Sequence, residues 1–129
     1  MPAHLLVYDH SAVILANIQH TLEMCGYKVT ARFPREIEPR EVAKHKPDII
    51  VLTLVEDSYR SAVERILQIH DDPTLVHMPI VIGVPTDQEI PTPQDIEGIV
   101  TVRYRQKPFN IDEIVAAVRA LEENDDSSR

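Results

Sequence analysis

The sequence predicts an α/β fold in which five parallel strands form one open, doubly wound sheet with helices on both faces. Short apolar runs alternate along the chain with longer segments whose apolar residues recur every three or four positions, the pattern of strands joined by helical crossovers. The strand runs are apolar almost throughout, as in parallel strands covered on both faces. The length of 129 residues suits a single domain.

The first half of the chain predicts three strands and two helices. The strands cover residues 4–8, 27–33 and 48–54. Ser11 can cap the first helix and Gly26 can stop it. The apolar positions of this helix fall at helical spacing: Ile14, Leu15, Ile18, Leu22 and Cys25. A weaker helix covers residues 35–45, because Pro39 fits only in a first helical turn.

The second half of the chain predicts a less regular continuation. Strands are expected over residues 80–84 and 99–106, and helices over residues 58–70 and 110–121. The last helix begins at a capping box formed by Asn110 and Glu113. Three prolines lie between the last two strands, so the fourth helix should be short or disrupted: Pro85, Pro91 and Pro93. Residues 1–121 then form the domain, and the acidic residues 122–129 form a disordered tail.

Composition and charge exclude several classes of function. The net charge of −8 opposes binding to nucleic acid, whose phosphates are neutralised by Lys and Arg. No apolar run reaches the roughly 20 residues of a membrane-spanning helix. Met1 is not followed by a basic leader with an apolar stretch, so we expect a cytoplasmic protein with no membrane partner. Cys25 is the only cysteine and lies on an apolar helix stripe, so a packed thiol is expected.

Candidate functional residues lie where the predicted strands end. In a doubly wound sheet, ligands bind at the carboxyl ends of the strands, beside the first strand. The residues there are Asp9, His10, Ser11, Thr53, Val84 and Lys107. The chain has three glycines, Gly26, Gly83 and Gly98, and none builds a loop that could cradle a phosphate. Since no Ser-His-Asp, zinc or paired-carboxylate arrangement stands out either, we expect no enzyme.

Several stretches of the sequence together resemble a known family. They are residues 5–10 (LLVYDH), 26–29 (GYKV), 46–52 (KPDIIVL), 72–73 (DP), 77–82 (HMPIVI), 104 (Y) and 107–109 (KPF). In this order and spacing they make the chain similar to the receiver domain of bacterial two-component response regulators over residues 4–121. The resemblance implies a flavodoxin-like, CheY-like sheet in the strand order 2-1-3-4-5 and a role in phosphorelay signal transduction.

The same resemblance shows what this sequence lacks. Receivers carry two acidic residues after the first strand and a phosphate-accepting aspartate at the end of the third. They also carry a Thr or Ser at the end of the fourth strand and a Lys-Pro pair after the fifth. Asp9 matches the first acid, Lys107 the lysine, and Tyr104 the aromatic residue that reports the switch. The second acid, the phosphate acceptor and the hydroxyl position are replaced by His10, Thr53 and Val84. The resemblance therefore implies a degenerate phosphorylation site.

These replacements change the chemistry expected at this edge of the sheet. Mg²⁺ needs several oxygen ligands, whereas Asp9 stands nearly alone and its charge is offset by Lys107, so we expect no Mg²⁺ and no other cofactor. His10 lacks a third ligand at convincing spacing, so we expect no transition metal either. The threonine hydroxyl of Thr53 is a weak nucleophile without a positioned base. Asp9 and Lys107 would then form a leftover ion pair.

We therefore expect an atypical receiver, or pseudo-receiver, that binds other proteins of a signalling pathway without phosphorylation. The partner would be a histidine kinase, an output domain or another regulator, and the chain itself a monomer or weak homodimer. The partner surface is either the last helix with the fifth strand, or the first helix. The first helix offers a mixed surface of Asn17, His20, Thr21 and Met24.

Two alternatives stay open from the sequence. The chain could be a receiver phosphorylated at an unconventional residue, namely Glu56, Asp57, Asp9 or Thr53. It could also be a flavodoxin-like domain that binds a small ligand in the crevice at the strand ends. The isomer of the peptide bond between Lys107 and Pro108 stays open as well.

Overall fold

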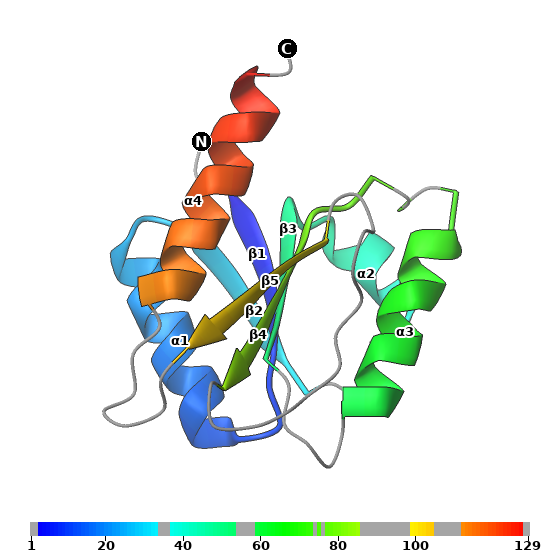
Figure 1. Cartoon of the computed structure of the whole chain (residues 1–129), viewed down its shortest axis with the longest axis horizontal. Helices are drawn as coiled ribbons and strands as arrows, with labels where there is room; N and C mark the ends of the chain where they lie inside the picture. The colour runs from blue at the N-terminus through cyan, green and yellow to red at the C-terminus, as the bar shows by residue number, and fades with distance from the viewer. Residues whose placement is uncertain are drawn as a thin grey trace.

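The five strands form one parallel sheet, as the sequence predicts. The computed structural model of the chain describes residues 3–33, 37–53, 59–73, 75, 77–85, 99–104 and 112–127, without the side chains of residues 59–63, 85, 103–104 and 123–127. The strands are β1 (His4–Tyr8), β2 (Lys28–Arg32), β3 (Ile49–Thr53), β4 (Ile80–Pro85) and β5 (Ile99–Tyr104). Their order is β2-β1-β3-β4-β5 (Figure 1), which confirms the predicted order.

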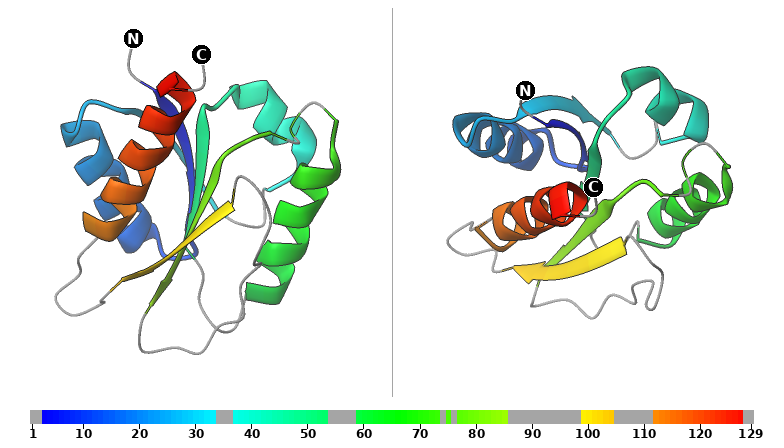
Figure 2. Two further views of the ribbon diagram at one scale, coloured as in Figure 1. Left: turned by 45° about the horizontal axis from the view of Figure 1, so that its top comes forward. Right: turned by 90° about the horizontal axis from the view of Figure 1, so that it is seen from above.

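Helices cover both faces of the sheet. Within the described residues they are α1 (Ala12–Met24), α2 (Pro39–His45), α3 (Tyr59–Asp71) and α4 (Asp112–Ser127). In Figures 1 and 2, α1 and α4 lie side by side on one face, and α2 and α3 lie on the other. This is the doubly wound arrangement that the alternating pattern predicts, because parallel strands need a crossover to return to the same edge.

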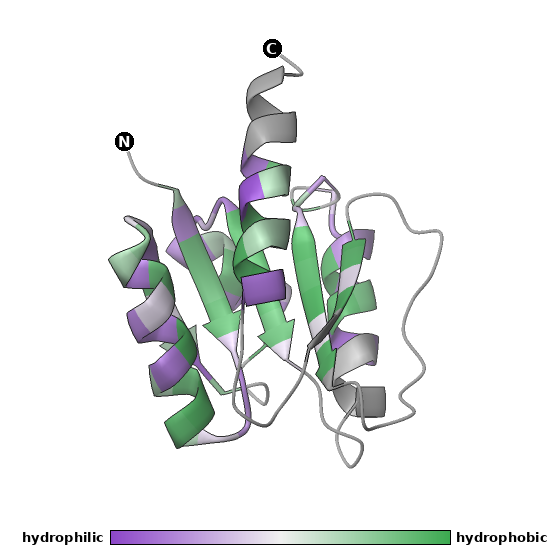
Figure 3. Ribbon diagram, turned by 60° about the vertical axis from the view of Figure 1, so that its left-hand side comes forward, coloured by the Kyte–Doolittle hydropathy of each residue, from purple (hydrophilic) through white to green (hydrophobic). Residues whose placement is uncertain are grey.

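Each face of the sheet carries its own hydrophobic core, because successive strand residues point to opposite faces. Under α2 and α3 lie Leu6, Tyr8, Ile50, Leu52, Ile80, Ile82 and Val84. Under α1 and α4 lie Leu5, Val7, Ile49, Val51 and Val81. Figure 3 shows the strands as mainly hydrophobic. The near-continuous apolar runs read from the sequence are therefore strands that are buried on both sides.

The predicted start and stop of α1 are confirmed. The hydroxyl of Ser11 accepts a hydrogen bond from the backbone N–H of Ile14 at 3.3 Å, which satisfies one of the unpaired donors of the first turn. Gly26 follows the helix with a φ of 97°, a left-handed conformation that favours glycine. Cys25 is half-buried against the core under α1, as expected for a packed thiol.

α2 and α4 differ from their predicted bounds by several residues, and α3 ends one residue later than predicted. α2 begins at Pro39, because proline is accommodated in the first helical turn. α4 continues to Ser127, whereas the sequence predicted a tail after residue 121. Arg119 and Glu122 of α4 both interact with Tyr27, the residue before β2. The sequence also predicted a short or disrupted helix between β4 and β5. That prediction concerns residues 86–98, which lie outside the described residues, as does the predicted cap Asn110.

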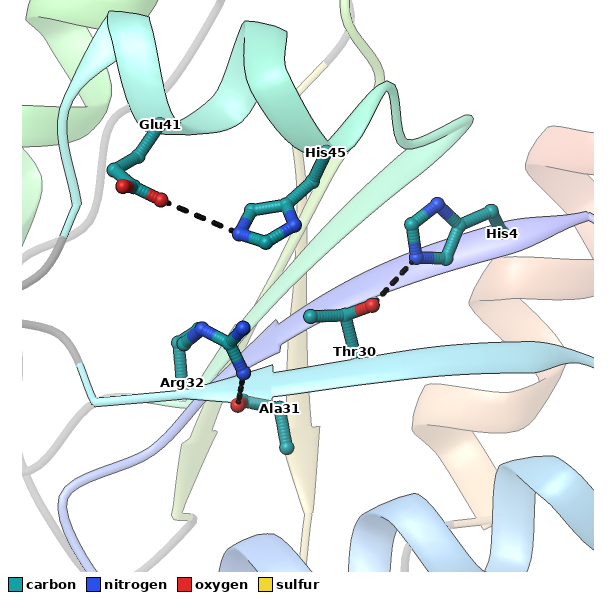
Figure 4. A network of polar contacts seen from close by, with 6 residues as sticks. All are labelled: His4, Thr30, Ala31, Arg32, Glu41 and His45. Atoms are coloured by element: carbon teal, nitrogen blue, oxygen red, sulfur yellow. Dashed lines mark hydrogen bonds and ion pairs between the residues drawn. The ribbon is translucent and has the colours of Figure 1, made fainter.

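Polar contacts fix the strands near the edge where they begin. The backbone N–H of His4 donates to Oδ2 of Asp48 at 2.7 Å, and the N–H of Asp48 donates back to the carbonyl of His4 at 2.7 Å. Figure 4 shows the His4 ring against the hydroxyl of Thr30, at 2.7 Å, across β1 and β2. The bonds between His4 and Asp48 join the start of β1 to the residue before β3, and the bond with Thr30 joins β1 to β2, where His4 pairs with Lys28.

No described helix is both long enough and apolar enough to cross a bilayer.

Candidate functional site

The candidate site lies at the carboxyl ends of the two central strands. Asp9 directly follows β1, and Thr53 is the last residue of β3. The two strands are hydrogen-bonded neighbours in a register that pairs Tyr8 with Leu52. Asp9 and Thr53 are therefore the next residues along adjacent strands, and the fold brings them together as the sequence predicts.

Thr53 and Asp9 are joined directly. The hydroxyl of Thr53 donates a hydrogen bond to Oδ2 of Asp9. The same hydroxyl lies 3.3 Å from the backbone carbonyl of Tyr8. The other carboxylate oxygen of Asp9, Oδ1, accepts a hydrogen bond from the backbone N–H of Ser11 at 2.7 Å. Both oxygens of the carboxylate thus have partners within the protein.

This pair is removed from solvent. Asp9 is 3% exposed and Thr53 is 1% exposed. Burial raises the pKa of Asp9 from 3.8 to about 6, because the charged carboxylate loses its hydration, and the hydrogen bond from the N–H of Ser11 lowers it in part. The buried acid therefore titrates in the mildly acidic range and is charged at neutral pH.

Asp9 also shapes the backbone between β1 and α1. Its own N–H donates to the carbonyl of Arg32 at 3.4 Å, which extends the pairing of β1 with β2 by one residue. Its carboxylate then accepts the N–H two residues ahead, the pattern of an Asx turn. Because the residue held by this turn is Ser11, which caps α1, Asp9 positions the start of the helix. Asp9 has a structural role here that does not depend on phosphate chemistry.

Of the other predicted site residues, the structure describes His10, Val84 and the backbone of Tyr104. His10 is exposed to solvent. Val84 is fully buried in the core under α2 and α3, so its side chain serves packing. Tyr104 ends β5 and pairs with Pro85, and only its backbone is described. Three predicted residues lie outside the described residues: Lys107, Glu56 and Asp57.

The described residues offer few oxygen ligands at this edge. They are the Asp9 carboxylate, both of whose oxygens already accept hydrogen bonds, and the Thr53 hydroxyl, which donates one. Mg²⁺ prefers oxygen ligands in near-octahedral geometry and usually keeps several waters among them. Among the described residues, no three His, Cys, Asp or Glu side chains come close enough together to hold a metal ion.

The sequence did not predict the direct bond between Thr53 and Asp9 or the second acceptor at Tyr8. The element order indicated only that the two residues end neighbouring strands. The bond itself depends on the strand register, which pairs Tyr8 with Leu52, and on the direction of the side chains. The Asp-x-Ser spacing indicates the Asx turn.

Comparison with known proteins identifies the fold. No protein-family model matches the chain, and no curated protein matches its sequence. The chemotaxis protein CheY4 of Vibrio cholerae superposes with a TM-score of 0.69 at 21% identity, over 93% of this chain and 98% of CheY4. The chain has the receiver-domain fold.

Other receiver structures agree with this assignment. The signal receiver domain of a modulated diguanylate cyclase from Desulfovibrio desulfuricans G20 matches with a TM-score of 0.70 at 18% identity, over 100% of both chains. The anti-anti-sigma factor PhyR from Bartonella quintana matches with a TM-score of 0.65 at 20% identity. That match covers 99% of this chain but 51% of PhyR, so the receiver fold accounts for about half of that longer protein.

Proposed function

We propose that this chain is a pseudo-receiver, a module that binds other signalling proteins without phosphorylation at the usual receiver position. The observation that carries the proposal is the buried hydrogen bond from Thr53 to Asp9. A receiver would hold acidic groups for metal and phosphate at both of these positions. In this chain Thr53 donates its hydrogen bond to Asp9, and both carboxylate oxygens of Asp9 accept hydrogen bonds from within the protein.

Phosphorylation of Thr53 conflicts with this geometry in two ways. Thr53 is 1% exposed, so a protein kinase could not reach its hydroxyl without opening the strand ends. A phosphate there would also place a charge of about −1.5 to −2 beside the Asp9 carboxylate. A threonine hydroxyl needs a positioned base to act as nucleophile, and Asp9 lies where it could accept that proton, but no metal-binding carboxylates surround the pair in the described residues.

The partner class follows from the receiver fold. Modules of this fold transmit signals by presenting a surface, so the partner would be a kinase, an output domain or another regulator of a signalling pathway. We propose neither an enzymatic activity nor a cofactor for this chain. The intact cores on both faces of the sheet support this reading, because a binding module needs the fold and does not need the switch.

Incubation with acetyl phosphate and Mg²⁺, followed by intact-mass spectrometry, tests the proposal. We expect no added phosphoryl group on the wild-type chain. A matched variant with both His10→Asp and Thr53→Asp regains the acidic pattern, and we expect it to gain one phosphoryl group that is lost in base. A base-labile phosphoryl group on the wild type would contradict the proposal and indicate a substitute acid such as Glu56 or Asp57. A base-stable group would indicate a phosphorylated threonine.

A further inference from the structure

The outward face of α1 carries the most exposed large apolar side chains among the described residues. Val13 is 71% exposed and Met24 is 76% exposed, whereas Leu67 and Val100 are each 37% exposed. Asn17 and His20 lie between Val13 and Met24 and are also exposed. These four residues, which we call the α1 stripe, recur at helical spacing directly opposite the buried residues of the helix.

The α1 stripe is also nearly free of charge. Glu23 is the only Asp, Glu, Lys or Arg in the helix, although 26% of the whole chain is charged. The neighbouring helix α4 presents Asp112, Glu113 and Arg119 to solvent instead. In a chain with a net charge of −8, a face with so little charge is where two copies can meet with the least repulsion between like charges.

The order of residues along the stripe is symmetric about its centre. The apolar residues Val13 and Met24 lie at its two ends, and the polar residues Asn17 and His20 lie in the middle. Two antiparallel copies related by a two-fold axis would therefore place Val13 against Met24 of the partner, and Asn17 against His20 of the partner. A two-fold interface requires this kind of self-complementarity.

Charge and helix dipoles select the antiparallel arrangement. A parallel pair would bring the two Glu23 side chains level with one another. An antiparallel pair sets them nine residues apart along the helices, or about 14 Å, which exceeds the Debye length of about 10 Å at 0.1 M salt. Antiparallel helices also oppose their macrodipoles.

From these observations we propose that α1 is a homodimer interface, in which the α1 stripes of two copies of this chain pack antiparallel across a two-fold axis. A helix of 13 residues is about 20 Å long. One helix face of this length buries less than the roughly 800 Å² per partner of a standard interface. The dimer is therefore weak, with a dissociation constant on the order of 0.1–1 mM.

Charged substitutions at the two ends of the stripe test the proposal by sedimentation equilibrium up to about 1 mM chain. Val13→Glu alone and Met24→Lys alone should each weaken dimerisation at least about tenfold, because each leaves a charge against an apolar side chain. Both substitutions in one chain should restore the dissociation constant to within about threefold, since every new carboxylate then faces a new ammonium. Val13→Glu places a negative charge near the N-terminus of α1, and Met24→Lys places a positive charge at its C-terminus, and both charges interact favourably with the helix dipole. The fold should therefore be retained, which thermal unfolding of each variant would verify.

Leu67→Glu on α3 is the matched control, because it adds a charge to an exposed apolar position on the other face of the sheet; it should leave dimerisation unchanged. A wild-type chain that stays monomeric at about 1 mM would overturn the proposal. So would single substitutions without effect, or a double substitution that fails to restore the dimer. This test is independent of the proposed function. A chain that does not dimerise could still bind signalling partners, and the result of the phosphorylation experiment says nothing about dimerisation.

Discussion

At the residue scale, the Asp9 carboxylate is the group around which the candidate site is built. Its two oxygens accept hydrogen bonds from Thr53 and from the backbone of Ser11, and its burial raises its pKa to about 6. These bonds connect β1 to β3 and β1 to α1. Asp9 matches a metal ligand of receivers in the sequence, but in the folded chain its hydrogen bonds link neighbouring elements. Its protonation therefore affects the stability of the fold.

Asp9 should make the chain less stable as the pH rises from about 4 to about 6. The folded-state pKa lies above the unfolded value of 3.8, so the folded state holds the proton more tightly in this window. The stability that Asp9 contributes is fully present below the unfolded pKa and is lost as the pH passes the folded pKa, by about 3 kcal/mol at most.

Urea unfolding at several pH values between about 3 and 8, compared between the wild type and Asp9→Asn, measures this effect. The asparagine can still accept from Ser11 but cannot titrate, so the variant should lose this part of the pH dependence. Equal pH profiles for the two proteins would contradict the role assigned to Asp9.

Thr53→Val should lower the free energy of unfolding at pH 7 by about 1–3 kcal/mol, because it removes one donor from a buried carboxylate. Valine is close to threonine in shape, so the loss reports the hydroxyl and not a cavity. Thr53→Ser keeps the hydroxyl and should retain this hydrogen bond. Near pH 4 the carboxyl group is largely protonated and the loss from Thr53→Val should shrink. A loss that is the same at both pH values would show that the hydroxyl acts on something other than the Asp9 charge.

At the scale of single elements, α1 shows how closely local signals in the sequence set the structure. Its cap at Ser11 and its stop at Gly26 were both readable from the sequence, because each depends on residues within one turn. The extension of α4 to Ser127 was not readable, because the polar residues 122–127 carry no apolar pattern that indicates a packed helix. Local signals predict a helix end only where such a pattern or a capping residue marks it.

Gly26→Ala should destabilise the chain by about 1–2 kcal/mol through the backbone alone. The φ of 97° is unfavourable for a residue with a Cβ, while an added Cβ would meet no atom within 4 Å. Gly26→Asn should cost less, since asparagine tolerates positive φ better than alanine. Thermal unfolding of the two variants gives the comparison. An alanine variant as stable as the wild type would mean that the turn relaxes to a different conformation.

At the scale of the whole molecule, the fold was predictable and the interior of the site was predictable in part. The strand runs and helical periodicities specify the sheet and its two covering layers, because burial on both faces leaves a strong hydrophobic pattern. That pattern brings Asp9 and Thr53 to one edge, which the sequence also predicted. The direct hydrogen bond between them depends on strand register and side-chain direction, which hydrophobic patterning does not encode.

The molecule therefore has the receiver fold with a hydrophobic core on each face of its sheet, and we propose that the hydrogen bond from Thr53 to Asp9 takes the place of a receiver's acidic cluster. The most direct test is to record amide chemical shifts of the labelled chain with Mg²⁺ and then with beryllofluoride, which mimics an acyl phosphate on aspartate. We predict no saturable shifts at Asp9, Ser11 or Thr53. Saturable shifts at these residues that spread to Tyr104 would contradict the account, because they would show a working phosphorylation switch.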